Sequence, residues 1–329
     1  MSVLEVRDLR VDYATEQGPV PAVRGVALRI DEGETLGLAG ESGCGKSTIA
    51  HAVLRLLPSG TGVTGSILLD GEDVLAMTFG RLRAVRWDEA AIVFQGAMHA
   101  LNPVRRVGDQ IAEAIRIHRP GTTEREAAGL VGDLVERVGL PRRRAGDYPH
   151  ELSGGQRQRI MIAMALACGP RLVIADEPTT ALDVMVQAQV LALLRSLQEE
   201  LGLALLFITH DLSVLAEVCD RIAVMYAGRI VEEGGAGHVF DEPAHPYTRA
   251  LAGAFPRIGH AADRRTPAGL GGDPPDPQRI PPGCSFHPRC PARFGPCDEV
   301  DPPLLPAGEG RRAACLLYDP ARAPEGAPA

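Results

Sequence analysis

One segment constrains the fold of this chain more than any other: residues 40–47, with the sequence GESGCGKS. It fits the pattern G-x-x-x-x-G-K-[ST] and follows an apolar run, Thr35–Ala39, that predicts a buried strand. A helical pattern runs from Lys46 to Leu57 and stops at Pro58. Glycines in such a loop let backbone N–H groups converge on phosphate oxygens, and the N-terminus of the helix attracts the same anion. The segment therefore predicts a phosphate-binding loop.

The use of lysine supports this interpretation. Of the 34 Lys and Arg residues, Lys46 is the only lysine. Lys is a compact point charge and Arg is a broad planar fork, so a tight phosphate site favours Lys. We expect Lys46 to reach the β- and γ-phosphates of ATP and Ser47 to ligate Mg²⁺. The other residues expected to contact the nucleotide here are Gly40, Glu41, Ser42, Gly43, Cys44, Gly45 and Thr48.

Two carboxylates follow the apolar run that ends at Ala175. Asp176 is expected to hold Mg²⁺, directly or through water. Glu177 is placed to polarise an attacking water, as a general base or as an orienting group. The alternative is an ordinary strand end followed by acidic loop residues, and the phosphate-binding loop argues against that alternative.

The segment LSGGQ, residues 152–156, precedes a helical pattern. Ser153 can cap that helix, while Gly154 and Gly155 expose backbone donors. Together with Gln156 they predict a second anion site. The alternative is a simple N-cap that happens to contain glycine.

Taken together, these motifs resemble the nucleotide-binding subunits of ABC transporters. The resemblance covers residues 1 to about 235 and adds four positions. They are Gln95 after a strand, as the Q-loop glutamine; Ala181-Leu182-Asp183, as the D-loop; His210, as the switch histidine; and Tyr13, 27 residues before Gly40, as the aromatic that stacks on adenine.

The resemblance implies roles for these residues. Two such domains sandwich two ATP molecules head to tail, so Ser153 to Gln156 would touch ATP bound by a partner. His210 would contact the γ-phosphate, and Gln95 would contact Mg²⁺ and water. Asp183 would lie at the nucleotide with the D-loop. Gln95 also begins the stretch that contacts the membrane subunit.

A narrower resemblance, to the oligopeptide/dipeptide importer branch, rests on Leu101-Asn102-Pro103, His245-Pro246-Tyr247-Thr248 and a cysteine-bearing tail. It implies a second ATPase subunit that is not identical, two membrane permease subunits and an extracytoplasmic solute-binding protein. The chain departs from the branch at Gly96-Ala97, where an acidic residue and proline are usual, and at Thr180, where serine is usual.

Strands that alternate with helices predict an α/β fold with parallel strands. We expect a P-loop ATPase core with a β-rich N-terminal edge over residues 1–255, including a helical subdomain at about residues 96–165. A C-terminal extension should follow over residues 256–329, which hold 16 of the 27 prolines.

Four cysteines lie in that extension: Cys284, Cys290, Cys297 and Cys315. Zinc sites usually show tighter pairs, and four thiolates also suit a 4Fe–4S cluster. The branch resemblance implies such a cluster in some members. Zinc and four free cysteines in a disordered tail are the alternatives.

Composition narrows the location and the partners. The formal net charge of −8 and the pI of about 5.6 disfavour nucleic acid as a partner. No apolar run approaches the roughly 20 residues that span a bilayer, and the N-terminus carries no signal-peptide pattern. We therefore expect a peripheral protein on the cytoplasmic face of the cell membrane, with reduced thiols.

The expected function is ATP hydrolysis that powers a multi-subunit importer of di- or oligopeptides. One rival is a soluble ABC protein of DNA repair or translation, which usually carries two cassettes or a large insertion. Another is a P-loop kinase or GTPase, in which LSGGQ has no role. An exporter is opposed by the lack of fused membrane helices and by the tail.

Overall fold

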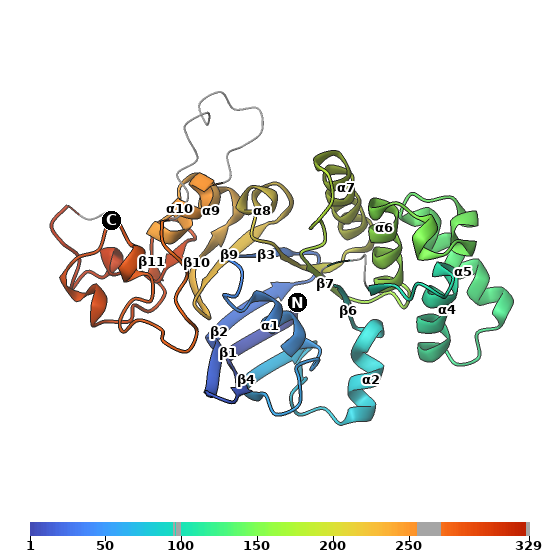
Figure 1. The fold of residues 1–329 in the computed structure, drawn as a ribbon, viewed down its shortest axis with the longest axis horizontal. Coiled ribbons are helices and arrows are strands. Elements are labelled where there is room, and N and C mark those ends of the chain that lie inside the picture. Colours follow the sequence, from blue (N-terminus) through green and yellow to red (C-terminus); the bar gives the residue numbers. More distant parts are fainter. Residues whose placement is uncertain (95, 97–99, 255–270, 327–329) are drawn as a thin grey trace. The chain divides into compact units, whose positions relative to one another are not determined.

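The computed structural model describes residues 1–94, 96, 100–254 and 271–326 (Figure 1). These residues form two compact units, which are described separately. The first unit comprises Met1–Leu4, Ile30–Glu34 and Leu69–Leu206. The second unit comprises Glu5–Arg29, Thr35–Leu68 and Phe207–Ala329. The described part of the C-terminal extension thus belongs to the second unit.

Two groups of strands build the second unit. In one, the strands lie in the order β2-β1-β4. In the other, the order is β11-β12-β10-β9-β3, and β3 runs parallel to β9 while β10 runs antiparallel to it. Every residue of β3 is buried, as the continuous apolar run predicts. The bounds are β1 (Ser2–Thr15), β2 (Gly18–Asp31), β3 (Thr35–Ala39), β4 (Gly62–Leu69), β9 (Arg221–Tyr226), β10 (Arg229–Gly235), β11 (Leu305–Pro306) and β12 (Arg312–Ala313).

The helices of the second unit follow these strands. They are α1 (Lys46–Val53), α8 (Leu212–Val218), α9 (Ala236–Asp241) and α10 (Pro246–Ala254). α8 packs closely on β3, because a Cβ added at Gly37 would lie 3.1 Å from the side chains of both Leu215 and Cys219. The side chain of Asp211 caps α8 by accepting hydrogen bonds from the N–H groups of Ser213 and Val214.

The described extension consists of short 3-10 helices and two strands of two residues each, and it lies beside β10 and α10 in Figure 1. β12 pairs antiparallel with β10, and Glu232 lies opposite Ala313. The 3-10 helices are His287–Arg289, Gly295–Asp298 and Leu316–Tyr318. Thus the proline-rich extension adds two short edge strands to the sheet.

The first unit combines a parallel strand pair with several helices. β6 (Ala90–Val93) runs parallel to β7 (Leu172–Asp176). Residues 107–137 form two helices rather than one, because Pro120 and Gly121 interrupt the helical pattern. The remaining bounds are β5 (Glu72–Asp73), α2 (Phe79–Asp88), α4 (Val107–His118), α5 (Glu124–Arg137), 3-10 helices at Arg142–Gly146 and Pro149–Glu151, α6 (Gly154–Ala165), α7 (Val184–Leu201) and, across the division, β8 (Ala204–Ile208).

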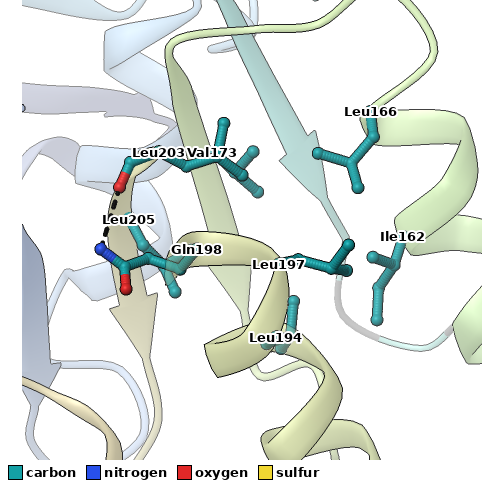
Figure 2. A pocket seen from close by; sticks show the side chains of 8 residues that line it. All are labelled: Ile162, Leu166, Val173, Leu194, Leu197, Gln198, Leu203 and Leu205. Atoms are coloured by element: carbon teal, nitrogen blue, oxygen red, sulfur yellow. Dashed lines mark hydrogen bonds between the residues drawn. The ribbon is translucent and has the colours of Figure 1, made fainter. Parts of the chain in front are cut away.

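Figure 2 shows part of the core of the first unit, where leucines of α7 face side chains of α6 and β7. They enclose a cavity of only about 10 Å³. Its single polar lining residue, Gln198, donates a hydrogen bond of 3.3 Å to the carbonyl of Leu203. A space of this size holds at most one water and is part of the packing. Among the described helices, none is both long and apolar enough to cross a membrane.

Candidate functional site

The loop between β3 and α1 has the backbone that the glycine pattern predicts. Gly40 has a φ of 149°, and a Cβ there would lie 2.3 Å from the carbonyl oxygen of Met225. Gly45 has a φ of 108°, and a Cβ there would lie 2.3 Å from the carbonyl oxygen of Ala22. Both positions therefore exclude any side chain, by conformation and by lack of space. The loop is held tightly between β9 and β2.

Lys46 turns back onto this loop. Its side chain is almost completely buried, with 5% of the residue exposed. The ammonium Nζ donates hydrogen bonds to the carbonyl oxygens of Gly40, at 2.7 Å, and Glu41, at 2.9 Å, and a longer one to Sγ of Cys44, at 3.7 Å. A buried cation needs such acceptors. The positive charge thus lies within the loop that the sequence assigns to phosphate.

The first turn of α1 presents further groups to the same loop. Gly45 is the N-cap of α1, and no side chain among the described residues caps the free N–H groups there. These donors and the helix dipole suit an anion. Ser47 is half-buried in this turn. The hydroxyl of Tyr13 is hydrogen-bonded to Oγ1 of Thr48 at 3.1 Å, so the structure brings Tyr13 to the loop.

Two acidic residues lie at the end of β7, in the first unit. Asp176 is its last residue and is 3% exposed. Glu177 follows with a φ of 45°, which is unusual for a residue with a side chain and typical of functional sites. Oγ1 of Thr180 donates a 2.8 Å hydrogen bond to Oε2 of Glu177. Thr180, where the importer branch usually has serine, therefore orients the carboxylate of Glu177.

The LSGGQ segment and the D-loop are brought together in the first unit. Ser153 and Gln156 form a capping box at the start of α6. A Cβ added at Gly155 would lie 2.4 Å from Cγ1 of Val186, in the first turn of α7. The carboxylate of Asp183 caps α7 by accepting from the N–H of Val186 at 3.0 Å. Asp183 therefore has a structural task beside the nucleotide contact that the resemblance implies.

The expected roles of two other predicted site residues stay predictions. His210 lies exposed in the turn between β8 and α8, in the second unit. Gln95 lies outside the described residues.

The four cysteines of the extension influence one another. Burial, together with the charges of Cys290 and Cys297, raises the pKa of Cys284 to about 11. Burial, together with the charges of the other three cysteines, raises the pKa of Cys315 to about 12. Among the described residues, however, no group of three or more His, Cys, Asp or Glu side chains is close enough to hold a metal ion. The structure therefore does not support the expected 4Fe–4S cluster or zinc site as a formed metal centre.

The sequence did not reveal two residues that hold the phosphate-binding loop. The Tyr247 hydroxyl accepts a 2.9 Å hydrogen bond from the N–H of Glu41. The Arg289 guanidinium contacts both carboxylate oxygens of Glu41, at 2.7 and 3.0 Å. Tyr247 belongs to the His245–Thr248 segment noted in the sequence, but the sequence assigned it no role. Arg289 lies between Cys284 and Cys290 but is otherwise one of many arginines.

Comparison with protein families gives two matches. Residues 23–180 match the family described as ABC transporter. Residues 231–297 match the oligopeptide/dipeptide transporter C-terminal region. The second match includes three of the four cysteines of the extension and Arg289.

Similar proteins cover nearly the whole chain. A putative peptide import ATP-binding protein of Brucella ovis is 45% identical over 96% of this chain and 97% of its own length. A probable peptide ABC transporter ATP-binding protein of Sinorhizobium fredii is 46% identical over 95% and 94%. The oligopeptide transport ATP-binding protein OppD of Salmonella typhimurium is 45% identical over 95% and 93%.

Solved structures of related proteins resemble about seven tenths of the chain. One is an ATP-binding cassette in a dimeric, post-hydrolysis state bound to ADP and Pi, with a TM-score of 0.64 and 28% identity, covering 71% of this chain and 98% of its own. Another is cbiO1 of Clostridium perfringens, part of an ABC transporter complex, with a TM-score of 0.63 and 30% identity, covering 73% and 91%.

Proposed function

The chain belongs to the ATP-hydrolysing subunits of ABC transporters, and from that premise we propose that it powers the import of di- or oligopeptides. One observation carries this proposal: the similarity to peptide import ATP-binding proteins extends through the C-terminal extension as well as the ATPase part. The solved ATP-binding cassettes, by contrast, cover only 71% and 73% of this chain.

The residues have the following proposed tasks. Lys46 and the N–H groups of the loop at 40–48 bind the phosphates of ATP, and Tyr13 stacks on the adenine. Ser47, Asp176 and Gln95 would hold Mg²⁺, which neutralises phosphate charge when bound. Glu177, kept in place by Thr180, accepts a proton from the attacking water or orients it. His210 contacts the γ-phosphate.

Assembly completes the site. The loop at 40–48 and the LSGGQ segment of one chain serve different ATP molecules, so Ser153, Gly154, Gly155, Gln156 and Asp183 act on ATP held by a second ATPase subunit. We propose that this second subunit is not identical. ATP binding should therefore promote the association of the two subunits. The isolated chain should hydrolyse ATP slowly and accelerate when its partners are added.

The remaining partners are two membrane permease subunits and an extracytoplasmic solute-binding protein, without nucleic acid. The chain would lie peripherally on the cytoplasmic face of the membrane. We propose that residues 1–255 form the ATPase domain, with its helical subdomain at about residues 96–165. Residues 256–329 form the extension.

The direct test of the import function is uptake by the reconstituted transporter. Proteoliposomes that contain both ATPase subunits, the permeases and the binding protein should accumulate labelled di- or oligopeptides when ATP is supplied on the ATPase side. The Lys46→Met variant should abolish uptake. Uptake of another solute class, with no peptide accumulated, would contradict the peptide proposal and leave the ATPase activity intact.

For the extension, we further propose that Cys284, Cys290, Cys297 and Cys315 bind a 4Fe–4S cluster when the metal is supplied; zinc is the alternative. Proximity supports it: the backbone N–H of Cys284 donates a 2.9 Å hydrogen bond to the carbonyl of Cys297, and Cys315 lies close enough to the other three thiols to be affected by their charge. The side chains would have to rearrange, because among the described residues no three of them meet at metal-binding distance.

A further inference from the structure

The C-terminal extension contacts the phosphate-binding loop through one ion pair, within the second unit. Arg289 and Glu41 are 248 residues apart in sequence, and they form a bidentate pair with N–O distances of 2.7 and 3.0 Å. The side chain of Arg289 is only 7% exposed and that of Glu41 is 22% exposed. A bidentate pair with so little solvent contact is geometrically specific and is screened weakly by salt.

The remaining donors of Arg289 fix its orientation. Nε donates to the carbonyl of Gly271 at 3.0 Å, and Nη1 also lies 3.4 Å from the hydroxyl of Tyr226. The guanidinium carbon lies 5.9 Å from the centre of the Tyr226 ring. Because the fork is held on three sides, it is preorganised for the Glu41 carboxylate.

An aromatic cluster anchors the segment that carries Arg289. Phe286 is buried and makes edge contacts with the rings of Tyr226, at 5.3 Å, and Tyr247, at 5.4 Å. Tyr247, which is completely buried, binds the backbone N–H of Glu41 through its hydroxyl. The extension and α10 therefore hold both the backbone and the side chain of the second residue of the loop.

Without its ion pair with Arg289, the Glu41 carboxylate would disfavour phosphate binding at this loop. It lies in the same segment that receives a triphosphate, and like charges at short range repel. Its backbone carbonyl accepts a hydrogen bond from Lys46, so a movement of Glu41 would also move an anchor of the cation. A group that neutralises this carboxylate and holds it in place should therefore favour phosphate binding at the loop.

We propose that Arg289 is a positioning residue for ATP: it neutralises Glu41 and keeps that carboxylate away from the phosphates. This inference rests on the binding of ATP at the loop. It makes the extension a part of the nucleotide site, because loss of the Arg289 guanidinium would lower the affinity for ATP. No charge in the extension needs to touch the nucleotide.

The test measures equilibrium binding of ATP and ADP to the full-length chain, with magnesium chelated to prevent hydrolysis. Arg289→Met should weaken ATP binding by about tenfold, within the usual range for coupling between two sites. The loss should be larger for ATP than for ADP, because the extra phosphate adds negative charge. Arg289→Lys keeps the charge without the fork and should give an intermediate loss.

The decisive comparison is a double-mutant cycle with Glu41→Gln. In the Glu41→Gln background, Arg289→Met should change the ATP affinity by less than about twofold, because the repelling charge is gone. Arg293→Met is the matched control, since Arg293 lies four residues after Arg289 in the same extension but pairs with Asp298 on the surface. It should not affect ATP binding.

Four results would overturn the proposal. An equal loss in both backgrounds, or an equal loss for ATP and ADP, would mean that Arg289 only holds the fold. Unchanged ATP affinity in Arg289→Met would show that Arg289 is not coupled to the ATP site, and it would not affect the proposed ATPase function. If the unmodified chain bound no ATP, both this inference and the ATPase function would fail.

Discussion

Thr180 donates a 2.8 Å hydrogen bond from its hydroxyl to the Glu177 carboxylate, three residues earlier in the chain. The backbone N–H of Thr180 also donates to the carbonyl of Glu177, which closes a turn that begins at this residue with positive φ. The geometry of the proposed base is therefore set locally, by the turn that follows β7. Any residue at position 180 that keeps a hydroxyl can maintain it.

Removal of this hydroxyl should slow hydrolysis without affecting ATP affinity. We expect Thr180→Val to lower the turnover of the assembled transporter about two- to tenfold, because one such hydrogen bond contributes about 0.5–1.5 kcal/mol. Thr180→Ser is the matched control and should stay within about twofold of the parent. A Thr180→Val transporter with the parent's turnover would show that the hydrogen bond does not orient Glu177 during catalysis.

Lys46 should not be replaceable by arginine. Its ammonium fits a buried space between the carbonyls of Gly40 and Glu41, which a planar guanidinium exceeds. We expect both Lys46→Arg and Lys46→Met to weaken ATP binding about 10- to 100-fold, since hydrogen bonds to charged groups contribute about 1.5–3 kcal/mol. Calorimetric titration of the isolated chain measures this. Near-normal affinity in Lys46→Arg would mean that charge alone matters at this position.

His245 should make the stability of the chain depend on pH. It is buried, and burial lowers its pKa from 6.5 to about 4. Its Nδ1 accepts a 3.0 Å hydrogen bond from the N–H of Tyr247, which requires the neutral ring. The unfolded chain binds a proton near pH 6.5 and the folded chain does not, so this contribution is complete above pH 6.5 and is lost as the pH falls towards 4.

The expected loss is about 1 kcal/mol between pH 7 and pH 5.5. Urea unfolding at both pH values measures it, and His245→Asn, which keeps an acceptor for Tyr247, is the control and should remove this part of the dependence. Burial raises the pKa of the neighbouring Glu232, whose effect has the opposite sign, but Glu232 is present in both proteins. Equal pH dependence of parent and variant would contradict the assignment to His245.

The cysteines of the extension give a separate prediction. Protein purified without oxygen should be brown and contain iron and sulfide in equal amounts. Cys315→Ser should remove both and expose the extension to protease, because metal binding would be its folding energy. Cys219→Ser, outside the extension, is the control and should keep the colour. Stoichiometric zinc without iron, or a colourless anaerobic protein, would refute the iron–sulfur cluster and leave the ATPase function untouched.

The sequence predicted the parts of the site that short-range patterns encode. The glycines of the loop at 40–47, the strand that ends at Asp176 and the cap at Ser153 each depend on neighbouring residues only, and the structure places each on the expected element. The hairpin of β9 and β10 was missed. Its turn consists of Ala227 and Gly228, both with positive φ, and alanine gives no signal for such a turn.

Contacts between distant residues could not be predicted. No local pattern links Arg289 with Glu41, because an ion pair depends on how the chain folds back over 248 residues. The pairing of Ala313 with Glu232 is similar: two-residue strands are too short to show alternation. The proline-rich composition correctly indicated irregular structure in the extension, but it did not show that this structure packs on the loop that binds phosphate.

The rate of phosphate release by the assembled transporter tests the central claim most directly, with Glu177→Gln compared with the parent. Glutamine keeps the shape of the side chain and loses the basic oxygen. ATP should still bind, while turnover falls by about a hundredfold or more, the usual range for a lost proton-transfer group. Near-normal turnover in the Glu177→Gln transporter would contradict the account of this chain as the subunit whose Glu177 drives ATP hydrolysis.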